Sequence, residues 1–398
     1  MRKKLLTGVL LFGFMAFQVS CYAADSPVKL TRKQKKEVAL LELAKVNFDN
    51  AQYDLAIEYY TKALLINPDN AETYSKRGNA EFLIRNYSNA VIDYSKAIEL
   101  DPKRENIYYN RGLAKVHLNE YDSVVEDYTK ELEINPENAN AYLNRGTTFV
   151  VFKEYENAID DFTKVVELDN TNILGYYNRG VAYRNLGDYE KAVIDYTKVI
   201  ELDNNNVEAY NNRGVAKFYL KDYKGAVEDY SKVIELDKNF KNVYFNRGIS
   251  ELGAKNYEDA ISDLTKELEL NPKNDSAYYQ RAIAFIQLDK ADDAIEDLTK
   301  AIEIVPSNAQ YYAERGAFIS KIDGDLDKAR QDLNKAIELD AKDAEKYLTR
   351  AIIFCKQKEY LLAIDDLNIL LQIDENNSHA QELRSYAIKS LDSQKPEK

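Results

Sequence analysis

The chain has 398 residues, and its 67 Asp and Glu outweigh 54 Lys and Arg to give a formal net charge of −13. This acidic balance disfavours nucleic acid as a partner, because nucleic-acid binding needs clustered cations. Two His and two Cys leave almost no soft ligands, so we expect no metal and no cofactor. With 45% hydrophobic residues the chain can build a core, whereas 14 Gly and 7 Pro are few for an all-β protein.

Residues 1–24 have the pattern of a secretory signal peptide. Cations at 2–4 precede an apolar run at 5–19, and small residues follow at 20–24. Fifteen apolar residues are too few for a membrane span, which needs about 20. We therefore expect cleavage after residue 23 or 24 and an exported protein, periplasmic or secreted.

Two alternatives concern the same segment. Val19-Ser20-Cys21 resembles the end of a lipobox, although Gln18 departs from that motif, so a lipid anchor on Cys21 is one alternative. An uncleaved anchor is the other. In each case membrane contact is expected only through the N-terminus. The basic leader at 25–36 carries five cations, which either face anionic lipid or form the solvated start of the first helix.

The following 341 residues repeat one pattern. Asn-Arg-Gly recurs every 34 residues from 110–112 to 246–248. Each unit predicts two helices, because apolar and small residues recur at i, i+4 and i+7, as in Tyr176, Gly180 and Tyr183. Seven units end in Asn, where an N-cap for the next helix is expected. The ten units are 37–70, 71–104, 105–138, 139–172, 173–206, 207–240, 241–274, 275–308, 309–343 and 344–377.

This period, with Gly where the helices cross and Ala in the second helix, resembles the tetratricopeptide repeat. The resemblance covers residues 37–377 and implies an all-α, right-handed α-solenoid of ten helix pairs. Tyr stands where the family usually has Trp, Ala282 and Ala351 replace the Gly, and Val124 replaces one Ala. Residues 378–391 predict a capping helix, and 392–398 a tail.

When the ten units are aligned, two further positions carry the same residue in most units, and we call each such position a column. An Arg before the crossing position and an Asp in the second helix are both present in nine units, whereas the first unit has Leu43 and Tyr59 instead. We predict an Arg–Asp ion pair within or between units, with an anion-binding Arg ladder as the alternative. The regular Tyr residues are expected to pack between helices with each hydroxyl reaching a partner, rather than to stack on a ligand.

A third column suggests a binding site. In tetratricopeptide superhelices the first helix of each unit lines the concave face, and five consecutive units carry an Asn there. An amide can bind a peptide group whatever its side chain, and nearby aromatic residues would add apolar contact. Duplication or inter-helix packing of these Asn is the alternative interpretation. The candidate peptide-binding residues are Asn110, Asn144, Asn178, Asn212, Asn246, Tyr109, Tyr177, Phe245 and Tyr279.

The sequence contains no catalytic constellation, because His117 and His379 stand alone. We predict a non-enzymatic protein–protein interaction scaffold of a bacterial-type cell envelope, which binds an extended peptide or a partner helix in its concave groove. The alternative is an envelope-anchored assembly factor that supports a membrane or pilus complex through its outer surface.

Overall fold

The computed structural model describes residues 30–322 and 324–394, and this part of the chain is all-α. It contains 21 α-helices, one short 3₁₀ helix and no strand. The predicted fold class is therefore confirmed as an all-α repeat solenoid. The predictions for the signal peptide, for Cys21 and for the start of the basic leader lie outside the described residues.

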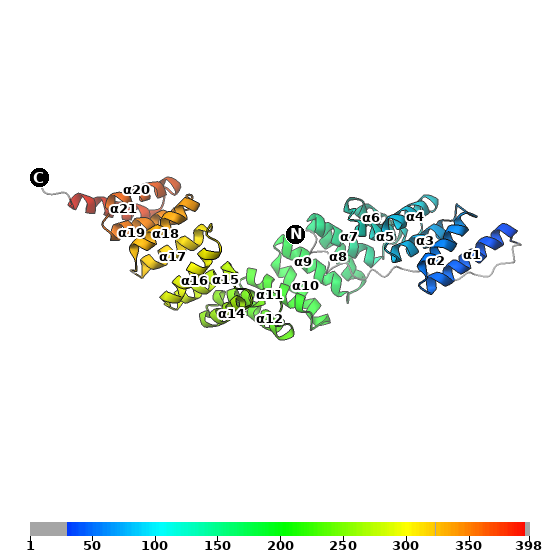
Figure 1. Ribbon diagram of the computed structural model, residues 1–398, viewed down its shortest axis with the longest axis horizontal. Coiled ribbons are helices and arrows are strands. Elements are labelled where there is room, and N and C mark those ends of the chain that lie inside the picture. Colours follow the sequence, from blue (N-terminus) through cyan, green and yellow to red (C-terminus); the bar gives the residue numbers. More distant parts are fainter. Residues whose placement is uncertain (1–29, 323, 395–398) are drawn as a thin grey trace. The chain divides into compact units, whose positions relative to one another are not determined.

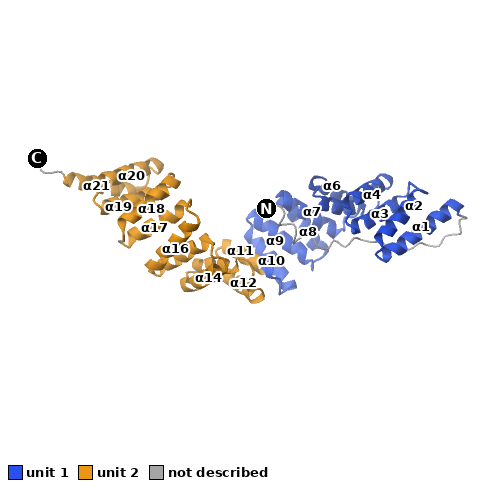
Figure 2. Cartoon of the chain, viewed as in Figure 1, with its two compact units in different colours: residues 1–209 blue, residues 210–398 orange. Residues whose placement is uncertain are grey.

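The chain divides into two compact units, residues 1–209 and 210–398 (Figure 2). The division falls in helix α11 (Val207–Tyr219). Unit 1 contains α1 (Arg32–Asp49), α2 (Tyr53–Leu64), α3 (Ala71–Leu83), α4 (Tyr87–Leu100), α5 (Ile107–Leu118), the 3₁₀ helix η1 (Tyr121–Ser123), α6 (Val124–Ile134), α7 (Ala139–Phe152), α8 (Tyr155–Leu168), α9 (Ile173–Leu186) and α10 (Tyr189–Leu202). Unit 2 contains α12 (Tyr223–Leu236), α13 (Val243–Gly253), α14 (Tyr257–Leu270), α15 (Asp275–Gln287), α16 (Ala291–Ile304), α17 (Ala309–Lys321), α18 (Leu326–Leu339), α19 (Ala344–Lys356), α20 (Tyr360–Ile373) and α21 (Ser378–Ser393).

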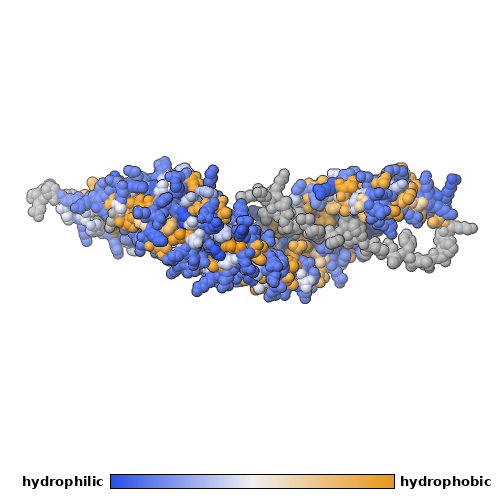
Figure 3. Space-filling model, turned by 60° about the horizontal axis from the view of Figure 1, so that its bottom comes forward, coloured by the Kyte–Doolittle hydropathy of each residue, from blue (hydrophilic) through white to orange (hydrophobic). Residues whose placement is uncertain are grey.

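Within each unit, helices pack on their neighbours in sequence. The first helix of a repeat packs on the second, and the second packs on the first helix of the next repeat (Figure 1). A small residue makes the close crossing possible: a Cβ added to Gly146 would lie 2.8 Å from Cε1 of Phe162. The Ala of the second helix, such as Ala158, is fully buried. Apolar and polar side chains alternate over the surface that Figure 3 shows.

Asn residues cap the first helices as predicted. The Asn138 side chain accepts a hydrogen bond from the backbone N–H of Ala141, and equivalent caps are formed by Asn70, Asn172, Asn206, Asn274, Asn308 and Asn377.

The third repeat begins its first helix differently. Helix α5 begins at Ile107, two residues after the expected start, and its N-cap residue Asn106 has a positive φ of 62° and no side-chain cap. The buried Glu131 of α6 accepts the backbone N–H groups of Asn106 at 2.9 Å and Tyr109 at 3.4 Å. A carboxylate from the following helix thus replaces the usual cap.

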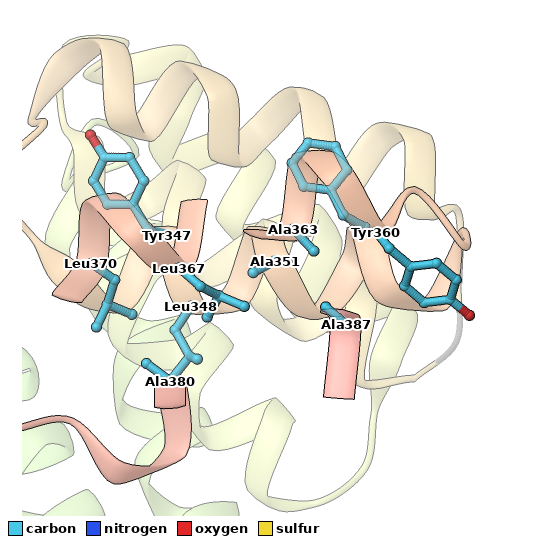
Figure 4. Close-up of a cluster of buried hydrophobic side chains, with 10 residues drawn as sticks. Tyr347, Leu348, Ala351, Tyr360, Ala363, Leu367, Leu370, Ala380 and Ala387 are labelled. Carbon is cyan, nitrogen blue, oxygen red and sulfur yellow. The ribbon is translucent and has the colours of Figure 1, made fainter. Parts of the chain in front are cut away.

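The ends of the described chain also differ from the expected boundaries. Helix α1 begins at Arg32, five residues before the first repeat, because Thr31 and Gln34 form a capping box; residues 32–36 of the basic leader are thus the exposed start of the first helix, as one of the two interpretations predicted. At the other end α21 extends to Ser393 and packs Ala380 and Ala387 against the cluster of α19 and α20 (Figure 4). Arg384 of α21 lies 34 residues after Arg350, and its Nε is buried without a hydrogen-bond partner.

None of the helices in the described ranges is long and apolar enough to cross a membrane.

Candidate functional site

The predicted Arg–Asp pairs are present in all nine repeats. Each guanidinium on a first helix contacts the Asp on the second helix of the same repeat, with shortest N···O distances of 2.5–2.7 Å. The pairs are Arg77–Asp93, Arg111–Asp127, Arg145–Asp161, Arg179–Asp195, Arg213–Asp229, Arg247–Asp263, Arg281–Asp297, Arg315–Asp332 and Arg350–Asp366. Hydrogen bonds to Asp161 hold the pKa of Arg145 above its ordinary value.

A third contact, which the sequence interpretation missed, extends this pair to the preceding repeat. Nη1 of Arg145 donates to Oγ1 of Thr129 in α6 at 2.9 Å. Equivalent bonds run from Arg77, Arg111, Arg179, Arg247, Arg281 and Arg315 to a Ser or Thr, and from Arg350 to Asn334. We call this three-residue contact the arginine clamp. The sequence contained the pattern, because the receiving residue follows the Asp of its own repeat by two positions, and in the first repeat Thr61 follows Tyr59, which stands in place of the Asp, by the same spacing.

The clamp leaves little of the guanidinium for a ligand. The guanidinium of Arg145 is hydrogen-bonded to Asp161 and Thr129, and it also lies over an aromatic ring. Its carbon Cζ is 5.7 Å from the ring centroid of Tyr142. The N–H groups of these arginines are therefore directed to protein partners, and each complete clamp links the two helices of its own repeat and joins that repeat to the preceding one.

The candidate Asn residues of unit 1 are buried or half-buried, and they do not form a row of exposed amides. Asn110 and Asn178 are 4% and 5% exposed, and Asn144 is half-buried. Nδ2 of Asn110 donates to Oδ1 of Asn79 at 3.3 Å, and Nδ2 of Asn144 donates to the hydroxyl of Tyr109 at 3.1 Å. Two of the three amides thus join neighbouring repeats.

Several buried polar atoms beside these amides have no partner. They are Oδ1 of Asn110, Nδ2 of Asn178 and the hydroxyl of Tyr128, which is fully buried. The Tyr column therefore packs between helices as predicted, but its hydroxyls do not all reach a partner. In the second repeat the hydroxyl of Tyr94 donates to Asn79, whereas the residue equivalent to Asn79 in the third repeat is the apolar Leu113.

The two aromatic candidates of unit 1 differ in exposure. Tyr109 is 1% exposed and packs in the core against Tyr128, and burial raises its pKa to about 12. Its ring does not line an open groove. Tyr177 is half-buried and lies edge-on to Tyr196, with ring centroids 5.9 Å apart.

A small cavity adjoins Asn144. Its volume of about 10 Å³ has room for a single water molecule. The lining residues are Val116, Tyr121, Tyr128, Asn144, Thr147, Thr148 and Val151. Tyr121 comes from η1, the turn that precedes Val124, so the irregular third repeat forms part of this cavity.

The candidates of unit 2 are less deeply buried. Asn212 is 9% exposed and Asn246 is half-buried. Phe245 packs beside Leu264. The hydroxyl of Tyr279 donates to Glu314 at 3.4 Å, and burial, with the charge of Glu314, raises the pKa of Tyr279.

Two observations concern metal ligands and the free cysteine. Within the described ranges, no group of three His, Cys, Asp or Glu side chains is placed to hold a metal ion. The Cys355 thiol is half-buried, and burial raises its pKa, which disfavours the reactive thiolate.

Stacked helix pairs joined by arginine clamps define a helical repeat protein. Family models described as tetratricopeptide repeat or TPR repeat match residues 38–70, 86–119, 105–138, 139–172, 173–206, 207–240, 245–309 and 309–343. The chain therefore belongs to the tetratricopeptide repeat family. These repeats support its assignment as a protein–protein interaction scaffold.

Solved structures of the same family are similar to this chain. YrrB, described as a TPR protein with an unusual peptide-binding site, is 25% identical, with a TM-score of 0.44 over 46% of this chain and 95% of its own. A tetratricopeptide repeat protein from Parabacteroides merdae is 21% identical, with a TM-score of 0.45 over 63% and 99%. Yeast Tom70 is 16% identical, with a TM-score of 0.40 over 91% and 97%. No curated protein matches the sequence.

Proposed function

We propose that the chain is an exported scaffold that holds an extended segment of a partner protein along the first helices of unit 1, through Asn110, Asn144 and Asn178. It acts by binding and carries out no reaction. The net charge of −13 favours basic partner segments.

The observation that carries this proposal is the unsatisfied amide chemistry of unit 1. Oδ1 of Asn110 and Nδ2 of Asn178 lie buried with no hydrogen-bond partner. Such an atom costs about 1–3 kcal/mol of stability. A peptide backbone offers both a donor for Oδ1 of Asn110 and an acceptor for Nδ2 of Asn178, so a bound segment that reached these side chains would satisfy both atoms.

Apolar side chains near the same amides support a peptide ligand. Val151 of α7 and Leu174 of α9 are 37% and 38% exposed, and Val181 is half-buried. All three belong to first helices, as the amides do. An extended chain that bonds the amides through its backbone can place alternate side chains on this apolar surface.

Site-specific photo-crosslinking tests the proposal. A benzophenone amino acid at Val151 is expected to capture partner segments from living cells, and Asn110, Asn144 and Asn178 replaced together by Ala should reduce the yield strongly. The matched controls are a probe at the exposed Ile92 of the second helix α4 and the change of Asn89 and Asn157, both exposed on second helices, to Ala. Equal yields from the folded triple variant and the control variant would refute the binding role of the Asn column.

The exported location is a separate part of the proposal and rests on residues 1–24. Mass spectrometry of the mature N-terminus separates a chain cleaved after residue 23 or 24 from one that carries diacylglycerol on Cys21. The lipidated form would favour the alternative function, an envelope-anchored assembly factor. An intact N-terminal Met1 in cytoplasmic fractions would contradict export.

A further inference from the structure

On the outer side of α1 lie the residue positions that, in later repeats, contact the preceding repeat. In later repeats the third, seventh and tenth residues of the repeat pack against the preceding repeat, as Ala141, Arg145 and Thr148 do in α7. Ala141 is fully buried there and Thr148 is 4% exposed.

In the first repeat the same three positions are apolar and uncovered. They are Ala39, Leu43 and Val46; Ala39 is exposed, and Leu43 and Val46 are 46% and 55% exposed. Leu43 stands where the other nine repeats have the clamp arginine. Because Leu43 cannot donate a hydrogen bond to a Ser or Thr as the clamp arginines do, this surface fits an apolar partner surface.

The opposite end of the described repeats has a different surface. On α21 the exposed residues include the polar Gln381 and Ser385 as well as Tyr386 and Ile388, which are 54% and 38% exposed. In Figure 1 α1 is the outermost helix of unit 1.

We propose that two copies of the chain associate through this face, with α1 packed antiparallel on α1 of the second copy about a two-fold axis. Lys36, Ala39, Leu43, Val46 and Asn50 follow one another at spacings of three and four, which places them in one stripe along the helix. Antiparallel pairing sets Ala39 of one copy opposite Val46 of the other, and the two Leu43 side chains meet near the axis.

The charges along α1 select the antiparallel direction. Lys35 and Lys36 lie exposed in its first turns, and Asp49 lies exposed at its last residue. In the antiparallel pair the cations of each copy lie beside Asp49 of the other, whereas a parallel pair would place like charges together. Glu42, beside Leu43, lies near the two-fold axis, where it faces Glu42 of the second copy. This repulsion between like charges weakens the dimer.

The contact is small, because a helix of 18 residues is about 27 Å long. We therefore expect a reversible dimer whose population rises with protein concentration. This association uses the outer side of α1 and is independent of the peptide-binding proposal above.

Analytical ultracentrifugation of the purified full chain, from about 1 to 300 µM, tests this proposal across the range of modest affinities. We expect a concentration-dependent dimer, weakened at least about a hundredfold by Leu43→Glu, which would bury two like charges in an apolar contact. Ile92→Glu is the matched control, since Ile92 is 64% exposed elsewhere, and should leave the dimer intact. A wild-type chain that stays monomeric, or a dimer that persists in Leu43→Glu, would overturn the proposal.

Charge exchange gives a second test that a different cover for the face would not pass. Lys36→Asp and Asp49→Lys should each weaken the dimer about fivefold, and the double variant should restore it, because both exchanged pairs are then opposite in sign. Glu42→Gln should strengthen the dimer. No restoration in the double variant, combined with an unchanged dissociation constant for Glu42→Gln, would rule out the antiparallel arrangement.

Discussion

The arginine clamp makes a quantitative prediction for the fourth repeat. Replacing Arg145 with Ala removes two bonds to Asp161, Nε–Oδ2 at 2.9 Å and Nη2–Oδ1 at 2.7 Å, and the 2.9 Å bond to Thr129. Asp161 is 3% exposed, so its carboxylate would remain buried without its counter-ion. Breaking one side of such a pair costs about 3–5 kcal/mol.

Two matched variants separate the parts of this loss. Thr129→Val removes the bond between repeats together with the bond from Oγ1 to the carbonyl of Val125, and should cost about 1–2 kcal/mol. Lys164→Ala removes an exposed ion pair to Glu167 on the same helix α8 and should cost less than about 1 kcal/mol. The expected order of destabilisation is therefore Arg145→Ala, then Thr129→Val, then Lys164→Ala.

Urea unfolding followed by circular dichroism measures these losses, and hydrogen exchange locates them. Because a solenoid is stabilised by contacts between neighbouring repeats, faster exchange in Arg145→Ala should concentrate in α6, α7 and α8. A loss from Arg145→Ala no larger than that from Lys164→Ala would refute the claim that the clamp holds the repeats together.

Three further predictions concern single residues of unit 1, each read from the urea midpoint. Gly146→Ala should lower stability by about 1–3 kcal/mol, because the new Cβ would lie 2.8 Å from the ring of Phe162, and an unchanged midpoint would contradict this close crossing. Tyr128→Phe should be neutral or stabilising, since its hydroxyl has no partner, whereas Tyr94→Phe should cost about 1 kcal/mol; equal losses would show that the Tyr128 hydroxyl has a partner in solution. Burial, and then the charge of Arg85, lower the pKa of His117 below 6.5, so the unfolded state binds the proton more readily and stability should fall as the pH drops through about 6.5. The difference in midpoint between about pH 7.5 and 5.5 should shrink in His117→Phe, and an identical difference would refute the assignment.

Much of the fold could be predicted because the same residue types recur at the same packing positions in successive repeats. Asn138 and its equivalents identified the helix starts, and the joint absence of Arg and Asp from the first repeat identified their contact. The receiving Thr129 was missed although it recurs equally regularly. A Ser or Thr in a helix has several possible partners, so its role depends on which helix lies opposite.

The candidate site was less predictable, because its geometry depends on positions that vary between repeats. Whether a Tyr hydroxyl finds a partner is decided by one such position, which is Asn79 in the second repeat and Leu113 in the third. The burial of Tyr109 and Asn110 likewise follows from how tightly α5 packs between its neighbours. The late start of α5 depends on Glu131, which lies 24 residues further along the chain.

Helix α21 repeats the first helix of the module that precedes it. Arg384 keeps the register of the clamp arginines, yet among the described residues no helix follows to present an Asp to its Nε. This helix is thus half a copy of the preceding module, and it exposes the polar Gln381 and Ser385 together with Tyr386 and Ile388. A second helix added after α21, with an Asp in register, should therefore pack on α21 and pair with Arg384. The array can thus be lengthened by protein engineering without redesign of α21.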